Sequence, residues 1–397
     1  MTHPRDGIAA ASTRALRAFE PVIVAADHVV TPDGVLVPGW LAVAGDRIAE
    51  LGQGEPPAPA ARRAHWALPG FIDLHVHGGG GASFTEGGPD DARRAAAFHR
   101  AHGTTRTLAS LVTAPVDRLA GRVAMLADLA DEGVIDGIHL EGPFLSAARC
   151  GAQDPRYLTA PDVTAFARLQ AASRGWLRMI TIAPELPGAA EVIRAAAAAG
   201  VIAAAGHTDA SAEVTAEAID AGVSHATHLF NAMRPIAHRA PGPAGALLDR
   251  QVTCEVVADG THLDDAIVRL AARAAGPGNL VLITDAMAAA GMPDGDYRLG
   301  DLAVTVSGGV ARLAGSTGSI AGSTATMELV VRRAITAVGL SVTDVADAAS
   351  TTPARRLGLD HVTGSLQPGL AADIVLLDAD FHLSAVIARG ECHQPAI

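Results

Sequence analysis

The residues best suited to chemistry are two histidines one residue apart, His75 and His77, at the end of an apolar run. On a β-strand, residues two apart point to the same side, so both imidazoles can face one point where a metal ion could be held. The glycines that follow, 78–81, would let the backbone turn sharply beyond such a strand. The pair alone is a weak signal, because a half-buried strand that ends in a turn would look the same.

The segments that must position this pair alternate between two types. Short β-like runs and Ala- and Arg-rich helical stretches follow one another between about residues 68 and 360, the pattern of a parallel α/β architecture. Eight such runs favour a (β/α)8 TIM-like barrel, whose active site lies at the carboxyl ends of the strands. We expect the strands at 71–77, 104–110, 137–141, 177–183, 201–207, 224–229, 252–258 and 280–285.

Candidate ligands and catalytic groups stand at the carboxyl ends of five of these expected strands. They are His75, His77, Glu141, His207, His228 and Asp285. Any one of them could be an ordinary polar residue at the mouth of a loop. Six residues of metal-binding type at one end of one barrel predict a shared metal centre.

The two ends of the chain are organised differently from the middle. Residues 21–67 have the pattern of short strands and turns, and residues 361–397 resemble them. Neither piece is long enough for a stable sheet by itself, so we expect both to meet in one small β-sandwich domain beside the barrel at 68–360. Residues 1–20 lack the apolar centre of a signal peptide, and we expect a flexible N-terminal extension there.

Composition excludes several classes of function. The net charge of -12 argues against a nucleic-acid or anionic-membrane surface, and no stretch has the length and purity of a membrane span. Three widely spaced cysteines fit a reducing cytoplasm. The chain contains no lysine, which excludes a Schiff-base mechanism, a P-loop nucleotide site and a metal centre bridged by carboxylated lysine.

Longer motifs surround these positions: HLEGPF at 139–144, GHT at 206–208, HATHLFNAM at 225–233, ADGTH at 258–262, TDA at 284–286 and AGS at 321–323. With these motifs the chain resembles the amidohydrolase superfamily and, within it, the N-acetylglucosamine-6-phosphate deacetylase family, from about residue 22 to residue 390. The resemblance implies that Glu141, His207 and His228 bind a divalent metal and that Asp285 is the catalytic acid/base.

The resemblance also bears on the number of ions. Some family members lack the paired histidines and use one metal, whereas others keep the pair and can hold two. This chain keeps His75 and His77, so one or two ions are expected, and Glu141 would bridge them in the place of carboxylated lysine. Zn²⁺ is the favoured ion, with Fe²⁺, Mn²⁺, Co²⁺ and Cd²⁺ as alternatives.

Substrate contacts follow from the resemblance as well, at Ala152, Gln153, Asn231, Ala232, Arg239, His262, Ile320, Ala321 and Gly322. A guanidinium binds phosphate in a two-pronged manner, which suits Arg239. In the family this arginine can come from the neighbouring subunit, which implies a homodimer. Gln153 is a departure, because some relatives have a histidine there that helps to hold or polarise the substrate.

The implied reaction is hydrolysis of the N-acetyl group of N-acetylglucosamine 6-phosphate to glucosamine 6-phosphate and acetate, in amino-sugar catabolism and cell-wall recycling. Another amidohydrolase, such as a cyclic-amide hydrolase or a deaminase, is the first alternative. The phosphate-facing residues argue against it, because neutral ring substrates do not need them. A catalytically inactive barrel scaffold is the second, but none of the expected ligands is lost.

Overall fold

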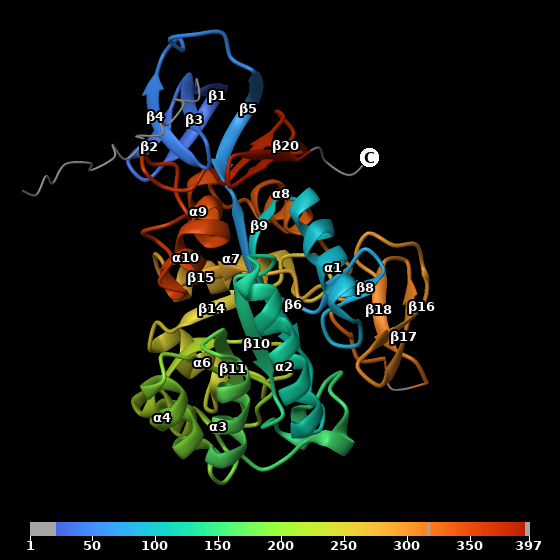
Figure 1. Cartoon of the computed structure of the whole chain (residues 1–397). Helices are drawn as coiled ribbons and strands as arrows, with labels where there is room; N and C mark the ends of the chain where they lie inside the picture. The colour runs from blue at the N-terminus through green and yellow to red at the C-terminus, as the bar shows by residue number, and fades with distance from the viewer. Residues whose placement is uncertain (1–20, 316–317, 394–397) are drawn as a thin grey trace, which may run out of the picture.

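The structure is a computed structural model that describes residues 21–315 and 318–393, so the expected N-terminal extension lies outside the described residues. Its centre is a sheet of eight parallel strands in sequential order, and an isolated parallel bridge between Val76 and Ala286 closes it into a barrel (Figure 1). The predicted (β/α)8 fold class is therefore confirmed. The strands are β6 (Phe71–Val76), β9 (Thr104–Leu111), β10 (Gly137–Glu141), β11 (Leu177–Ile182), β12 (Ile202–Ala205), β13 (Val223–Ala226), β14 (Thr253–Val256) and β15 (Leu280–Leu282).

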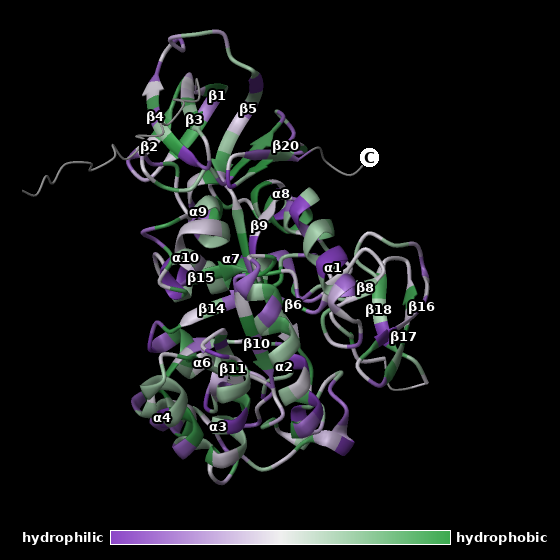
Figure 2. Cartoon of the chain, viewed as in Figure 1, coloured by the Kyte–Doolittle hydropathy of each residue, from purple (hydrophilic) through white to green (hydrophobic). Residues whose placement is uncertain are grey.

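Helices cover the outside of the barrel. The buried side chains of α4 are Ala189, Val192, Ile193 and Ala196, a helical spacing that places one apolar stripe against the strands. Hydrophobic residues accordingly gather in the strands, and hydrophilic patches lie on the outer helices (Figure 2). The helices are α1 (Pro89–Ala101), α2 (Val116–Asp131), α3 (Val163–Ala172), α4 (Ala189–Ala198), α5 (Ala212–Ala221), α6 (Gly242–Asp249), α7 (Asp265–Ala275), α8 (Met327–Thr336), α9 (Val342–Ala346) and α10 (Thr352–Arg356). None of them is both long enough and apolar enough to cross a bilayer.

Both ends of the chain build one small β domain, as expected. Strand β5 pairs in parallel with β1 on one side and antiparallel with β19 on the other, so the N-terminal and C-terminal strands form one continuous sheet. In Figure 1 these are the blue and red strands above the barrel. The sheet contains β1 (Val22–Thr31), β2 (Gly34–Leu36), β3 (Gly39–Ala44), β4 (Arg47–Gln53), β5 (Arg62–Pro69), β19 (Ile374–Leu377), β20 (Leu383–Ala388) and β21 (Glu391–His393).

A third sheet was not predicted from the sequence. Three antiparallel strands follow the last barrel strand: β16 (Gly295–Leu299), β17 (Leu302–Ser307) and β18 (Val310–Leu313). Their buried side chains pack on Val112 and Met287, beside the carboxyl ends of the barrel strands. This sheet therefore adds a wall next to the expected active site.

Candidate metal centre

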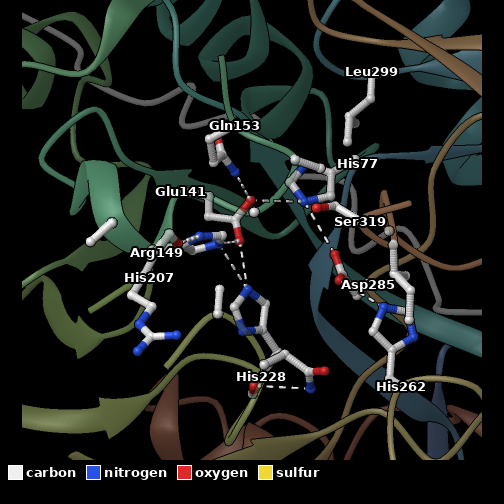
Figure 3. Close-up of a pocket in the computed structure, with 17 residues that line it drawn as sticks. His77, Glu141, Arg149, Gln153, His207, His228, His262, Asp285, Leu299 and Ser319 are labelled. Carbon is white, nitrogen blue, oxygen red and sulfur yellow. Dashed lines mark hydrogen bonds and ion pairs between the residues drawn. The ribbon is translucent and has the colours of Figure 1, made fainter. Parts of the chain in front are cut away.

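The structure brings all six expected ligand and catalytic side chains together at the carboxyl ends of the barrel strands. Two groups of three could each hold an ion, and within each group the ligand atoms lie within 4.8 Å of one another. Every one of these residues is buried. In Figure 3 the side chains of His77, Glu141, His207, His228 and Asp285 point toward one another across the pocket. The first group is Glu141, His207 and His228, and the second is His75, His77 and Asp285.

Glu141 joins the two groups. Its Oε1 lies 2.9 Å from Nε2 of His207 and 2.9 Å from Nε2 of His228. Its Oε2 lies 3.3 Å from Nε2 of His77, and Oε1 lies 3.5 Å from Nε2 of His75. A single carboxylate thus faces four imidazoles, the geometry expected of a bridging ligand.

The second group closes around Asp285. Its Oδ1 lies 3.5 Å from Nε2 of His75 and 3.4 Å from Nε2 of His77, and the two imidazole nitrogens are 3.1 Å apart. His262 approaches the other carboxylate oxygen, with 3.8 Å between its Nε2 and Oδ2 of Asp285. Asp285 therefore belongs to a candidate ligand group and also lines the open pocket.

The outer nitrogens of the histidines show that this donor set fits a cation. Nδ1 of His75 faces the Glu255 carboxylate, Nδ1 of His77 faces the backbone oxygen of Ser110, and Nδ1 of His207 faces that of Arg149. Each of these three nitrogens meets an acceptor and so carries the proton, which leaves Nε2 with a lone pair aimed inward. Converging lone pairs and carboxylates repel one another unless positive charge lies between them.

The electrostatics of the cluster agree with this conclusion. Burial opposes charge on His75, but the carboxylates of Glu141 and Asp285 outweigh it and hold the pKa of His75 well above its usual value. Burial likewise opposes charge on His77, yet hydrogen bonds to Asp285 and Glu141 raise its pKa to about 9. The pKa of Glu141 lies well below its usual value, because His75 and His207 outweigh burial. The two carboxylates thus attract positive charge strongly.

The backbone turns abruptly where three of these side chains leave the barrel. His207, His228 and Asp285 have φ values of 46°, 26° and 50°, in a region that L-residues seldom adopt. The corresponding strands end at 205, 226 and 282, two or three residues before the functional side chains and earlier than the sequence predicts. Beyond these turns the chain continues in isolated bridges, such as those of Thr208 with Met233 and of Ala286 with Val76.

The expected substrate residues lie in different places. Seven of them line the pocket above the metal-ligand groups, whereas Ala321 is fully buried in the core of the third sheet and Arg239 is exposed outside the pocket. The seven are Ala152, Gln153, Asn231, Ala232, His262, Ile320 and Gly322. Leu299 of β16 and Arg149 also line it, and sequence reasoning did not single them out.

Gln153 is engaged at both ends of its amide. Its Nε2 donates to Oε2 of Glu141, and its Oε1 accepts from the backbone N–H of Thr113 at 2.7 Å. The side chain is buried between Glu141 and Thr113 at the edge of the pocket. Gln153 therefore fixes the orientation of the Glu141 carboxylate.

Glu255 is the main functional candidate that sequence reasoning missed. It lies fully buried on β14. Its carboxylate oxygens lie within hydrogen-bonding distance of the His75 and His225 imidazoles and of the backbone N–H of His228. Nε2 of His225 lies 3.0 Å from Oε1 of Glu255. The available signal was a carboxylate in the middle of the otherwise apolar strand 252–258.

A (β/α)8 barrel with a histidine and carboxylate cluster at its strand ends defines a metal-dependent hydrolase. Comparison with known sequences agrees: the chain belongs to the amidohydrolase family, which matches residues 66–393.

Named relatives match nearly the whole chain. It is 34% identical to N-acetylgalactosamine-6-phosphate deacetylase of Escherichia coli O157:H7, with 93% of this chain and 98% of that protein covered. It is 35% identical to N-acetylglucosamine-6-phosphate deacetylase of Bacillus subtilis (strain 168), with 94% and 96% covered. A solved structure of a mutant N-acetyl-D-glucosamine-6-phosphate deacetylase from Mycobacterium smegmatis, in complex with N-acetyl-D-glucosamine-6-phosphate, is 48% identical, with a TM-score of 0.91 over 94% of this chain and 99% of that one.

The two ligand groups predict different metal contents for two single variants. His207→Ala should remove the ion of the Glu141 group and nearly all activity. His75→Ala should lower the content from two ions per chain toward one and leave partial activity, because the Glu141 group stays complete. Elemental analysis after exhaustive dialysis measures both. A His75→Ala protein with the wild-type metal content would contradict the second site.

Proposed function

We propose that the chain hydrolyses the N-acetyl amide of N-acetylglucosamine 6-phosphate to glucosamine 6-phosphate and acetate. The observation that carries this proposal is the position of Asp285, which belongs to a candidate ligand group and also lines the pocket beside Asn231, Ala232 and His262. The Mycobacterium smegmatis enzyme bound to this compound supports the choice of substrate, at 48% identity.

The two ligand groups would hold one or two divalent ions, with Zn²⁺ as the proposed metal because imidazole and carboxylate ligands suit it. When bound, such an ion supplies Lewis-acid chemistry, since it polarises a carbonyl and makes water more acidic. Glu141 is shared between the groups and its orientation is fixed by Gln153. The side chains of Asp285 and His262 would carry out the proton transfer and bind the substrate.

Asp285 would move the proton. Burial raises the pKa of a carboxyl, but His75 and His77 outweigh it and lower the pKa of Asp285 to about 2, so the side chain is an ionised acceptor at neutral pH. It would take a proton from the attacking water and pass it to the departing amine, which cannot leave as an anion. One carboxylate thereby acts as base and then as acid.

His262 would supply a positive donor on the open side of Asp285. Its Nδ1 lies 2.8 Å from Oδ2 of Asp259. Burial opposes charge on His262, but this hydrogen bond and the charge of Asp285 raise its pKa above the usual value. A protonated His262 can donate to an oxygen of the substrate through Nε2. A neutral imidazole with its proton on Nδ1 cannot, because its Nε2 then only accepts hydrogen bonds.

Arg239 would complete the phosphate site of a second copy of the chain. Residues 235–240 form a continuous exposed loop, and Arg239 lies outside the pocket of its own subunit. Arg149 is the arginine that lines this pocket among the described residues, and its Nε donates to Oδ1 of Asp209 at 2.8 Å. We therefore propose a homodimer in which Arg239 reaches the partner's pocket.

The proposed setting is the cytoplasm, in amino-sugar catabolism and cell-wall recycling. The net charge of -12 supports a small-molecule substrate over a nucleic-acid or membrane partner. Cys150, Cys254 and Cys392 are all free thiols, which supports a reducing compartment.

Acetate release from a panel of substrates tests the proposed reaction. Metal-loaded protein should deacetylate N-acetylglucosamine 6-phosphate with a higher kcat/KM than its galactosamine epimer or unphosphorylated N-acetylglucosamine. Protein stripped with a chelator should be inactive and should recover on addition of Zn²⁺. Faster turnover of cyclic amides or nucleobases would place the chain elsewhere in the amidohydrolase family.

Asp285→Asn tests the proton transfer. The amide cannot accept the proton of the attacking water, so kcat should fall by a factor on the order of 10² to 10⁴. Folding should be preserved, because the amide has the shape of the carboxylate it replaces. Steady-state kinetics at matched metal content measures the loss. Near-normal turnover would show that another residue is the base.

Arg239→Ala tests the phosphate contact. Loss of a charge-assisted hydrogen bond costs about 1.5 to 3 kcal/mol, or roughly 10 to 150-fold in kcat/KM, and the loss should fall on the phosphorylated substrate alone. Arg149→Ala is the matched comparison, because Arg149 lines the pocket within the same subunit. Equal losses on phosphorylated and unphosphorylated substrate would show that Arg239 supports the fold. A phosphate-specific loss confined to Arg149→Ala would overturn the contribution from the second subunit.

A further inference from the structure

Glu255 is a buried carboxylate that belongs to neither candidate metal-ligand group. It lies on β14, the seventh barrel strand, and neither group of three among the described residues draws a ligand from that strand. Its side chain is fully buried beneath the centre. Burying a carboxylate costs desolvation free energy unless several hydrogen-bond donors compensate it. The donors around Glu255 therefore indicate its role.

Three donors meet the two oxygens of Glu255. Oε2 lies 3.2 Å from Nδ1 of His75 and accepts from the backbone N–H of His228 at 3.0 Å. Oε1 lies 3.0 Å from Nε2 of His225. The contacts therefore reach one residue of each metal-ligand group, together with a histidine that belongs to neither.

The two contacts with ligand residues have different consequences. An ionised carboxylate only accepts hydrogen bonds, so Nδ1 of His75 must carry the proton and its Nε2 keeps the lone pair that faces His77 and Asp285. The contact with His228 holds a main-chain N–H at a residue whose φ is 26°. Glu255 thus sets the tautomer and ring orientation of one ligand and the backbone of another.

We propose that Glu255 is a positioning residue for the metal centre, which orients His75 for the second ion while it anchors the strand end that presents His228 to the first. This inference rests on the proposed two-ion centre. Carboxylates that orient a ligating histidine typically contribute 10–100-fold to metal affinity, about the effect expected here.

Glu255→Gln separates the two contacts. An amide oxygen at the position of Oε2 still accepts from the His228 N–H, so the ion of the Glu141 group should keep its affinity. The amide is a weaker acceptor for Nδ1 of His75, so the ion of the other group should bind about 10 to 100-fold more weakly. Titration of metal-free protein with Zn²⁺ in competition with a chromophoric chelator gives both affinities without reference to activity.

Asp73→Asn is the matched control. Asp73 is also fully buried and lies near His75, but it accepts from the backbone N–H groups of His75 and Thr284 and from the Thr284 hydroxyl. This variant should retain both zinc affinities. The double variant His75→Ala, Glu255→Gln should bind its remaining ion, that of the Glu141 group, as tightly as His75→Ala alone. The second site is already lost with His75, and the amide oxygen still accepts from the His228 N–H.

The outcomes distinguish this inference from the centre on which it rests. If wild-type protein binds a single ion, the two-ion centre is wrong. If wild type binds two and Glu255→Gln binds both as tightly as Asp73→Asn, the role of Glu255 is overturned. Should Glu255→Gln fail to fold, imidazole ¹⁵N spectra of zinc-loaded wild type decide the matter: His75 must carry its proton on Nδ1, and a proton on Nε2 would overturn the proposal.

Discussion

The whole centre depends on one buried carboxylate that four imidazoles surround. Glu141 is almost completely shielded from water, and its oxygens lie between 2.9 and 3.5 Å from the Nε2 atoms of His75, His77, His207 and His228. No single strand could arrange this, because the four histidines leave the ends of three different strands. The closed barrel brings these ends together, and in doing so it creates a site that is stable only with positive charge inside.

A second layer of contacts holds the ligands in place. Gln153 fixes the Glu141 carboxylate, Glu255 and the Ser110 carbonyl face the outer nitrogens of the paired histidines, and the Arg149 carbonyl faces that of His207. These contacts restrict the ring orientation of each candidate ligand. Three of the site residues have strained backbone conformations with positive φ. With no lysine in the chain, a shared glutamate is a consistent solution for a centre of two ions.

Much of this arrangement could be predicted because it is local in sequence. The eight barrel strands are short apolar runs with helical stretches between them, and polar residues at their ends stand out against such runs. The small domain could be predicted from two matching patterns at the chain ends. Asp285 and the candidate ligands could be selected because their residue types are those that bind metal or move protons, and the structure brings them together.

Features that depend on tertiary contacts escaped the sequence analysis. The sheet β16–β18 has the alternating pattern of a surface hairpin at 302–313, which went unassigned among the barrel elements. Glu255 sits inside an apolar strand, where a lone carboxylate shows its role only through the histidines that meet it in space. The exposure of Arg239 depends on how the 235–240 loop leaves the barrel, and no residue type in that loop predicts its direction.

Anomalous X-ray diffraction at the zinc edge, from crystals of zinc-loaded wild-type protein, tests the central claim most directly. The account predicts two anomalous peaks, one among Glu141, His207 and His228 and the other among His75, His77 and Asp285, with the Glu141 carboxylate between them. A single peak, or peaks away from these side chains, would contradict a centre organised around one shared carboxylate.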